Sequence, residues 1–266
     1  MSTHPSIAVV TGAGRGIGAG IAGALAARGH HVLVTDLDAA AAERSAAVLA
    51  GRGGTATAMP LDVRDASAHH GVALAAAALG DVSVWVNNAG VLSTAPAWEE
   101  SEEATVRTFE VNTLGVVHGC RAAVEVMRRG DVLNVVSLSA LGPTPGFAAY
   151  GASKAAALSW TQALDVELTQ ARRPIRVRAL CPDVVSTDLL AGVADSPSAA
   201  LLYTARHLAV DEVVDAAMGM LGSRRQMRTL PARRAALMRL SGSAPGLARA
   251  LTPMVARAAE RRRHRR

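Results

Sequence analysis

Six short apolar runs alternate with helical stretches along the first 182 residues of the chain. The runs are rich in β-branched residues, which is typical of strands buried on both faces. Strands that alternate with helices imply right-handed crossovers and a parallel sheet. We therefore expect an α/β fold with a Rossmann-like, doubly wound parallel sheet in a single domain. The expected strands are 6–11, 31–36, one within 55–63, 82–88, 131–137 and 175–182. The expected helices are an Ala-rich stretch that follows the glycine-rich residues 12–18 and ends near Arg28, and then 38–50, 66–79, 99–129 (kinked near Gly115) and 150–171.

No linker or internal repeat interrupts the chain before residue 223. We expect one domain over residues 1–225 and a basic C-terminal extension over residues 226–266. MRTL (227–230) is a weak strand candidate, and three prolines interrupt any helix beyond it.

Composition favours a protein of the reducing cytoplasm. Half of the residues are hydrophobic but only 3% are aromatic, so Ala, Val and Leu must fill the core. The two cysteines, Cys120 and Cys181, are too few for a disulfide scaffold. No apolar run is long enough to span a membrane, and the N-terminal segment does not have the pattern of a signal peptide.

Positive charge is concentrated in the extension. Residues 224–266 contain thirteen arginines and one glutamate, a net charge of +12, whereas residues 1–223 carry a net charge of −6. The extension has no aromatic residue for stacking, so we do not expect nucleic acid as a partner. We expect a solvated extension, with weak peripheral membrane contact as the alternative, because Leu247, Leu251, Val255 and Ala258 recur at helical spacing between arginines.

A glycine-rich segment, TGAGRGIG (11–18), follows the first expected strand and opens the first expected helix. Glycines in such a turn allow close approach of a pyrophosphate, which the amide groups at the helix N-terminus bind. Asp36 ends the second strand, where its carboxylate can accept both adenosine ribose hydroxyls. It would repel a 2′-phosphate, so NAD is expected over NADP, although Arg15 could bind that phosphate.

Tyr150 and Lys154 are four residues apart on an expected helix and therefore share one face. Lys154 is the only lysine among twenty-eight basic residues. An ammonium about 4 Å from a phenol is worth roughly 4 kcal/mol at an effective dielectric of about 20, which would move the tyrosine pKa from about 10 toward 7. The pair predicts proton exchange with an alcohol or carbonyl.

Together these segments resemble the short-chain dehydrogenase/reductase family. The resemblance rests on TGAGRGIG, Asp36, LDV (61–63), NNAG (87–90), VN (111–112), YGASK (150–154) and CPDVVST (181–187). It covers roughly residues 5–222 and implies a seven-stranded parallel sheet, an NAD(P)-dependent oxidoreductase acting on alcohols and carbonyls, and a homodimer or homotetramer.

The resemblance also implies site residues. The implied catalytic set is Asn112, Ser137, Tyr150 and Lys154, with Asn112 holding a water in a proton relay. The implied cofactor-binding residues are Gly12, Arg15, Gly16, Ile17, Gly18, Asp36, Asp62, Val63, Asn88, Ala89, Gly90, Tyr150, Lys154, Pro182, Val185 and Thr187. No metal site is expected, because the histidines form adjacent pairs without ligand spacing.

Two serines compete for the place beside Tyr150. Strand periodicity points Ser137 and Ser139 to the same side, so it does not discriminate. The family separation of thirteen residues from serine to tyrosine selects Ser137, whereas the local Ser-x-x-Gly pattern selects Ser139. We choose Ser137, because the other alignment would shorten the following loop.

Parts of the chain depart from the family pattern or leave alternatives open. Asp183 replaces the usual glycine and would put an acid beside the nicotinamide. The arginine-rich tail is expected to replace the seventh strand. Segment 188–210 offers Leu189, Leu190, Val193, Leu201, Leu202 and Tyr203, which either bind an apolar substrate or pack the lid. A catalytically silent NAD(H)-binding regulator is the alternative to an enzyme.

Overall fold

The computed structural model describes residues 5–193, 196–204, 206–244, 246, 249–250 and 253. Its centre is a seven-stranded sheet in the order β3-β2-β1-β4-β5-β6-β7, with every neighbouring pair parallel. The strands are β1 (Ser6–Thr11), β2 (His31–Asp36), β3 (Thr55–Pro60), β4 (Asp81–Asn87), β5 (Gly130–Val135), β6 (Ile175–Pro182) and β7 (Met227–Leu230).

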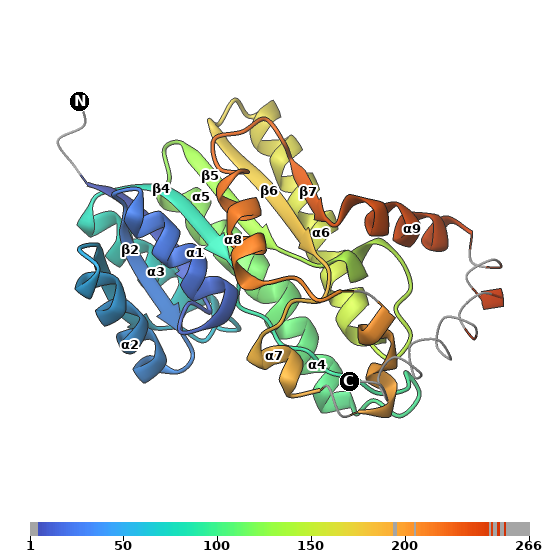
Figure 1. The fold of residues 1–266 in the computed structure, drawn as a ribbon. Helices are drawn as coiled ribbons and strands as arrows, with labels where there is room; N and C mark the ends of the chain where they lie inside the picture. Colours follow the sequence, from blue (N-terminus) through green and yellow to red (C-terminus); the bar gives the residue numbers. More distant parts are fainter. Residues whose placement is uncertain are drawn as a thin grey trace.

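Helices cover both faces of this sheet (Figure 1). The α-helices are α1 (Gly16–Ala27), α2 (Ala39–Gly51), α3 (Ala66–Leu79), α4 (Glu102–Phe109), α5 (Gly115–Val126), α6 (Ala148–Gln170), α7 (Asp188–Ala191), α8 (Val210–Met218) and α9 (Ala232–Ser243). A π-helical turn η1 (Glu110–Leu114) and the 3-10 helices η2 (Leu138–Leu141) and η3 (Pro197–Thr204) complete the described part. The doubly wound fold is as predicted.

Alternate residues of each strand pack into two cores, one on each face. In β1, Ala8 and Val10 contact the core beneath α1, α2 and α8, whereas Ile7 and Val9 contact the core beneath α3, α5 and α6. Burial on both faces explains why the strands read as continuous apolar runs. The strand order reverses between β1 and β4, so ligands are expected at the carboxyl ends of these strands.

The C-terminal part of the sheet corrects the sequence analysis. The seventh strand is present: β7 pairs with β6 from Ala179–Met227 to Pro182–Leu230. Strand β7 thus lies within the expected extension, residues 226–266. Helix α9 follows at the β7 edge (Figure 1), and its Ala235 is buried in a third small core. Most of the residues beyond 244, including Leu247, Leu251, Val255 and Ala258, lie outside the described residues.

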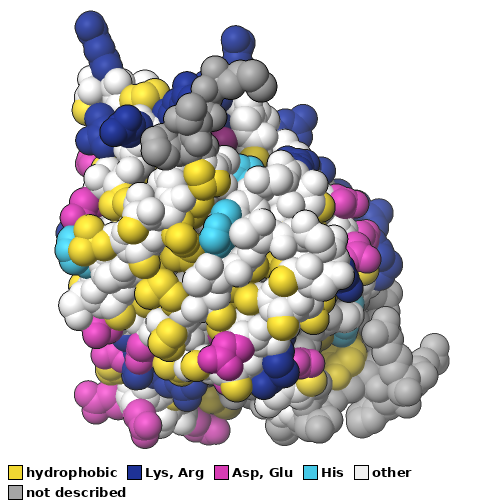
Figure 2. All heavy atoms as spheres, turned by 90° about the vertical axis from the view of Figure 1, so that its left-hand side faces the viewer, with side chains coloured by type: hydrophobic (Ala, Val, Ile, Leu, Met, Phe, Trp, Pro, Cys, Tyr) yellow, Lys and Arg dark blue, Asp and Glu magenta, His cyan; other side chains and the backbone are white. Residues whose placement is uncertain are grey.

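The surface at the opposite end of the sheet carries both signs of charge. Figure 2 looks onto the side where α2 and α3 lie and shows hydrophobic side chains interspersed among acidic, basic and polar ones. No helix among the described residues combines the length and apolar character needed to cross a bilayer.

Candidate active site

The glycine-rich turn between β1 and α1 has the geometry of an anion-binding site. Gly12 and Gly16 have φ angles of +61° and +58°, which side chains rarely adopt. A Cβ at Gly12 would lie 2.8 Å from the Cα of Ala89. Helix α1 then begins at Gly16, and its N-cap residue Arg15 makes no side-chain hydrogen bond to the first turn. The amide groups there have no side-chain cap, which fits a bound pyrophosphate.

Hydrogen bonds fix this turn to the end of β4. The Asn88 side chain donates to the carbonyls of Thr11 and Gly12, both at 3.0 Å. The Thr11 hydroxyl accepts from the amides of Asn88 and Ala89, both at 3.1 Å. A Cβ at Gly18 would lie too close to the Gly12 carbonyl, so only glycine permits this approach of α1 to the turn.

Asp36 stands at the end of β2, as expected for a ribose-binding acid. Its two carboxylate oxygens accept the amides of Gly14 at 2.9 Å and Asp38 at 3.1 Å. Each carboxylate oxygen retains a further lone pair for a hydroxyl donor. Arg15 instead lies 4.0 Å from Asp188, and both side chains are more than three-quarters exposed. Such an exposed pair is weak, so Arg15 stays available to other anions.

Asp62 and Val63 follow β3 beside this ribose end of the site. The Leu61 amide donates to the Asp36 carbonyl at 2.9 Å, which places the segment at the edge of the cofactor side. Arg64 binds both oxygens of Asp62, with Nε at 3.0 Å and Nη2 at 2.6 Å, and lowers the pKa of that carboxyl. Val63 is buried, so its side chain packs into the core.

Tyr150 and Lys154 lie on the first two turns of α6. Lys154 is 4% exposed, and its ammonium donates to the Val135 carbonyl at 3.1 Å. The same nitrogen lies 5.9 Å from the centroid of the Tyr150 ring. A Cβ at Gly90 would lie 3.1 Å from Oδ1 of Asn112 and 3.4 Å from Nζ of Lys154, so the loop after β4 packs closely beside these two side chains.

The expected lowering of the Tyr150 pKa toward neutrality is wrong for this arrangement. Burial raises the pKa of Tyr150, and a hydrogen bond with Ser137 opposes that rise. Burial also lowers the pKa of Lys154 to about 8. The Lys154 ammonium binds a backbone carbonyl and lies over the ring of Tyr150. The loss of solvation is therefore the largest effect on the pKa of the phenol.

Ser137, and not Ser139, meets the tyrosine. The Ser137 side chain is hydrogen-bonded to Tyr150 and accepts the Ser139 amide at 3.1 Å. The assumption of strand periodicity was wrong, because β5 ends at Val135 and residues 138–141 form a 3-10 helix. Ser137 caps that helix and is 8% exposed.

Asn112 lies in the π-helical turn η1 that separates α4 from α5. The expected single helix over 99–129 is thus broken by a feature that recurs at functional sites. The Asn112 amide donates to the Val91 carbonyl at 3.0 Å and the Ser153 hydroxyl at 3.2 Å, and its oxygen accepts the Val91 amide at 2.9 Å. This fully buried side chain ties the loop after β4 to α6.

The chain runs from the carboxyl end of β6, at Pro182, toward the glycine-rich turn and includes Val185 and Thr187. Val185 forms an isolated parallel bridge with Leu208. A Cβ at Gly16 would lie 3.7 Å from the Thr187 methyl group, so Thr187 faces the start of α1 across the cofactor side.

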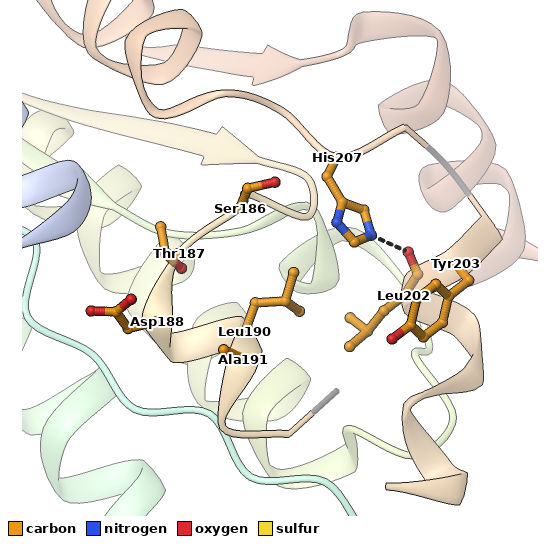
Figure 3. A pocket seen from close by; sticks show the side chains of 8 residues that line it. All are labelled: Ser186, Thr187, Asp188, Leu190, Ala191, Leu202, Tyr203 and His207. Carbon is orange, nitrogen blue, oxygen red and sulfur yellow. Dashed lines mark hydrogen bonds between the residues drawn. The ribbon is translucent and has the colours of Figure 1, made fainter. Parts of the chain in front are cut away.

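A pocket of about 340 Å³ opens between this segment and the end of η3, which we call part of the lid (Figure 3). Its lining residues are Ser186, Thr187, Asp188, Leu190, Ala191, Leu202, Tyr203 and His207. Three of the six apolar or aromatic residues expected there are among them, and the side chain of Leu201 lies outside the described residues. Nε2 of His207 is hydrogen-bonded to the Leu202 carbonyl at 3.1 Å, a contact that the sequence does not predict. No sequence signal distinguished it from a surface histidine.

No group of three or more His, Cys, Asp or Glu side chains is placed to hold a metal ion in the part of the chain that the structure describes.

A parallel sheet with a glycine-rich, anion-binding turn at its switch point is the architecture of a dinucleotide-binding protein. The family model described as short chain dehydrogenase matches residues 6–197. The chain therefore belongs to the short-chain dehydrogenase family of oxidoreductases.

Individual relatives agree with this assignment. The chain is 35% identical over 232 residues to the 1-deoxy-11-beta-hydroxypentalenate dehydrogenase of Streptomyces avermitilis, covering 85% of this chain and 84% of that protein. It is 37% identical over 187 residues to the probable oxidoreductase EphD of Mycobacterium bovis, covering 68% of this chain but only 31% of that longer protein. A crystal structure of a short chain dehydrogenase/reductase from Burkholderia phymatum in complex with NAD superposes with a TM-score of 0.84 at 26% identity, covering 93% of this chain and 96% of that one.

Proposed function

We propose that this protein transfers a hydride between NAD(H) and an alcohol or ketone, with Tyr150 as the general acid and base. The observation that carries the proposal is the meeting of Ser137, Tyr150 and Lys154 within one buried site at the carboxyl ends of the central strands. A proton donor, a hydroxyl partner and a cation are the groups that carbonyl reduction requires of a protein.

The cofactor site is built from backbone more than from side chains. The amides at the start of α1 would bind the pyrophosphate, and Asp36 would accept the ribose hydroxyls. Val185 and Thr187, which follow β6, would hold the nicotinamide end, with the Thr187 methyl group facing the start of α1. The bound dinucleotide supplies the hydride-transfer chemistry.

Residues of this chain handle the proton. Tyr150 gives its phenolic proton to the carbonyl oxygen during reduction and removes the hydroxyl proton during oxidation. Ser137 stabilises the phenolate by its hydrogen bond, which lowers the Tyr150 pKa against the effect of burial. Lys154, with a pKa of about 8, is mostly protonated at pH 7 and contributes a positive charge beside the ring. Asn112 positions the loop after β4.

NAD is proposed over NADP because of Asp36. A 2′-phosphate on the ribose would meet a carboxylate already fixed by two backbone amides. Arg15, the N-cap residue of α1 in the glycine-rich turn, is a cation that could offset this repulsion.

The substrate is proposed to be an apolar alcohol or ketone of moderate size. Leu190, Ala191 and Leu202 contribute apolar surface to the pocket, while His207 and Ser186 offer a small number of polar groups. A small-molecule partner of this kind suits such a lining. We also infer, from family membership, a homodimer or homotetramer, which sedimentation equilibrium would test.

A panel of secondary alcohols and ketones assayed with NAD(H) and NADP(H) tests the proposal. We expect turnover of apolar cyclic or branched substrates with NAD(H) preferred. Tight NADH binding without turnover of any substrate would instead favour a catalytically silent regulator, and activity confined to small charged hydroxy acids would contradict the proposed substrate class.

A further inference from the structure

Asp183, the acid that follows β6, forms an ion pair with an arginine of the C-terminal helix. Its Oδ2 lies 2.6 Å from Nε of Arg234 in α9, although the direction of the N–H does not meet the requirements of a hydrogen bond. The two side chains are 9% and 25% exposed. A charge pair this far from water is costly to separate, because either partner left alone would be a buried, uncompensated charge.

Arg234 also reaches the lid. Its Nη2 donates to the Thr204 hydroxyl at 2.6 Å, and Thr204 is the last residue of η3. The neighbouring residues Leu202 and Tyr203 line the pocket. One guanidinium therefore contacts both the loop after β6 and the end of the lid, a use of its planar fork that a lysine could not reproduce.

The rest of α9 is held against the catalytic side of the molecule. A Cβ at Gly142 would lie too close to the Met238 carbonyl, so α9 approaches the end of η2 through glycine. Helix η2 is the one capped by Ser137. Backbone hydrogen bonds also hold the loop after β6. The Asp183 amide donates to the Leu230 carbonyl, and the Leu208 amide donates to the Val184 carbonyl, both at 2.8 Å.

We propose that Arg234 is a positioning residue that braces the lid, residues 197–204 and 206–208, against the loop after β6 and so sets the shape of the substrate pocket. Its ion pair also neutralises Asp183. This inference rests on the proposed function for its kinetic consequence, but the bracing itself is a property of the folded chain. Arg234 touches no reacting group and acts through Thr204 and Asp183.

The test compares Arg234→Met with Arg233→Met, which removes the exposed neighbouring arginine of the same helix. Hydrogen–deuterium exchange of peptides from residues 197–208 is measured together with kcat, KM and NADH affinity. Arg234→Met is expected to accelerate exchange in the lid and raise KM roughly tenfold, the effect of losing a charged hydrogen bond, with kcat and NADH affinity changed less than about threefold. Arg233→Met is expected to match the wild type.

Two further variants keep the inference testable if Arg234→Met folds poorly. Thr204→Val removes the lid contact alone and should accelerate lid exchange while the ion pair persists. Asp183→Asn combined with Arg234→Met should recover stability relative to Arg234→Met, because no unpaired buried acid remains. Unchanged lid exchange in both Arg234→Met and Thr204→Val would overturn the inference, as would equal effects of Arg233→Met. Faster lid exchange in a protein without any turnover would uphold the brace and refute only the proposed enzyme activity.

Discussion

Replacing Ser137 with alanine removes the one side-chain hydrogen bond that opposes the burial-induced rise in the Tyr150 pKa. A hydrogen bond to a charged group is worth about 1.5–3 kcal/mol. Since about 1.4 kcal/mol corresponds to a tenfold change, Ser137→Ala should lower kcat/KM roughly 10- to 100-fold and raise the Tyr150 pKa further, because the hydrogen bond that lowers it is lost. NADH affinity should change little, because Ser137 lies beside the phenol.

The pH profile gives the sign of the effect. Alcohol oxidation needs the deprotonated phenol, so its rate rises with pH and levels off above the Tyr150 pKa. Loss of a bond that stabilises the phenolate raises that pKa, and the rising limb must move to higher pH. Initial rates of NADH formation between pH 6 and 11 measure this directly.

Ser139→Ala is the matched control. Its backbone amide, which donates to Ser137, is retained in the variant, and the hydroxyl that is lost is not the one bonded to Tyr150. We expect near wild-type turnover and an unshifted profile. A larger loss for Ser139→Ala than for Ser137→Ala, or a shift of the Ser137→Ala limb to lower pH, would refute the reasoning.

Three further predictions concern the cofactor, the buried lysine and the core. Asp36→Ala should relax the preference for NAD over NADP, measured as the ratio of kcat/KM values, because the repelling carboxylate is gone; a wild type that already prefers NADP would contradict this. Lys154→Met should abolish turnover yet stabilise the fold by about 2 kcal/mol at pH 7. Removing the buried charge is stabilising, because burial lowers the Lys154 pKa from 10.5 to about 8, and the loss of the hydrogen bond to the Val135 carbonyl offsets part of this gain. The unfolded chain binds more protons than the folded one between these two pH values, so the gain over wild type is largest below pH 8 and fades by about pH 10.5 in thermal unfolding scans. Asn134→Ala should lower the free energy of unfolding by about 2–4 kcal/mol in urea titrations, because it removes the 2.8 Å hydrogen bonds that the buried side chains of Asn87 and Thr161 each make with Asn134; an unchanged midpoint would show that this network contributes nothing.

The apolar runs predicted the central strands to within a few residues, because strands buried on both faces must be continuously hydrophobic. The seventh strand, MRTL (227–230), was only a weak candidate, and the arginine-rich tail was expected to replace it. It has four residues, includes Arg228, and is only partly buried at the sheet edge, so its sequence gives no strong signal. Gly115 suggested a kink in the long helix, and it directly follows η1, but the π-helical form of the break left no signal because a π-helical turn changes hydrogen bonding without requiring glycine or proline.

Some features of the site could be predicted from local sequence, and others depend on segments that are distant along the chain. Turn glycines and the acid closing β2 follow from local sequence, because the turn conformation itself selects those residues. The electrostatics of Tyr150 depend on burial by distant segments, which spacing along one helix does not report. Likewise, Asp183 and Arg234 meet only because β7 returns α9 to the carboxyl end of β6.

Isotope transfer tests the central proposal most directly. The protein is incubated with NAD and a secondary alcohol deuterated at the carbinol carbon, and the reduced cofactor is analysed by mass spectrometry. We predict deuterated NADH from the wild type and label transfer slower by about 10²–10⁴-fold from Tyr150→Phe, which should still bind NADH, because this is the usual cost of losing a general acid or base. Equal label transfer by Tyr150→Phe and wild type would contradict the role assigned to this tyrosine.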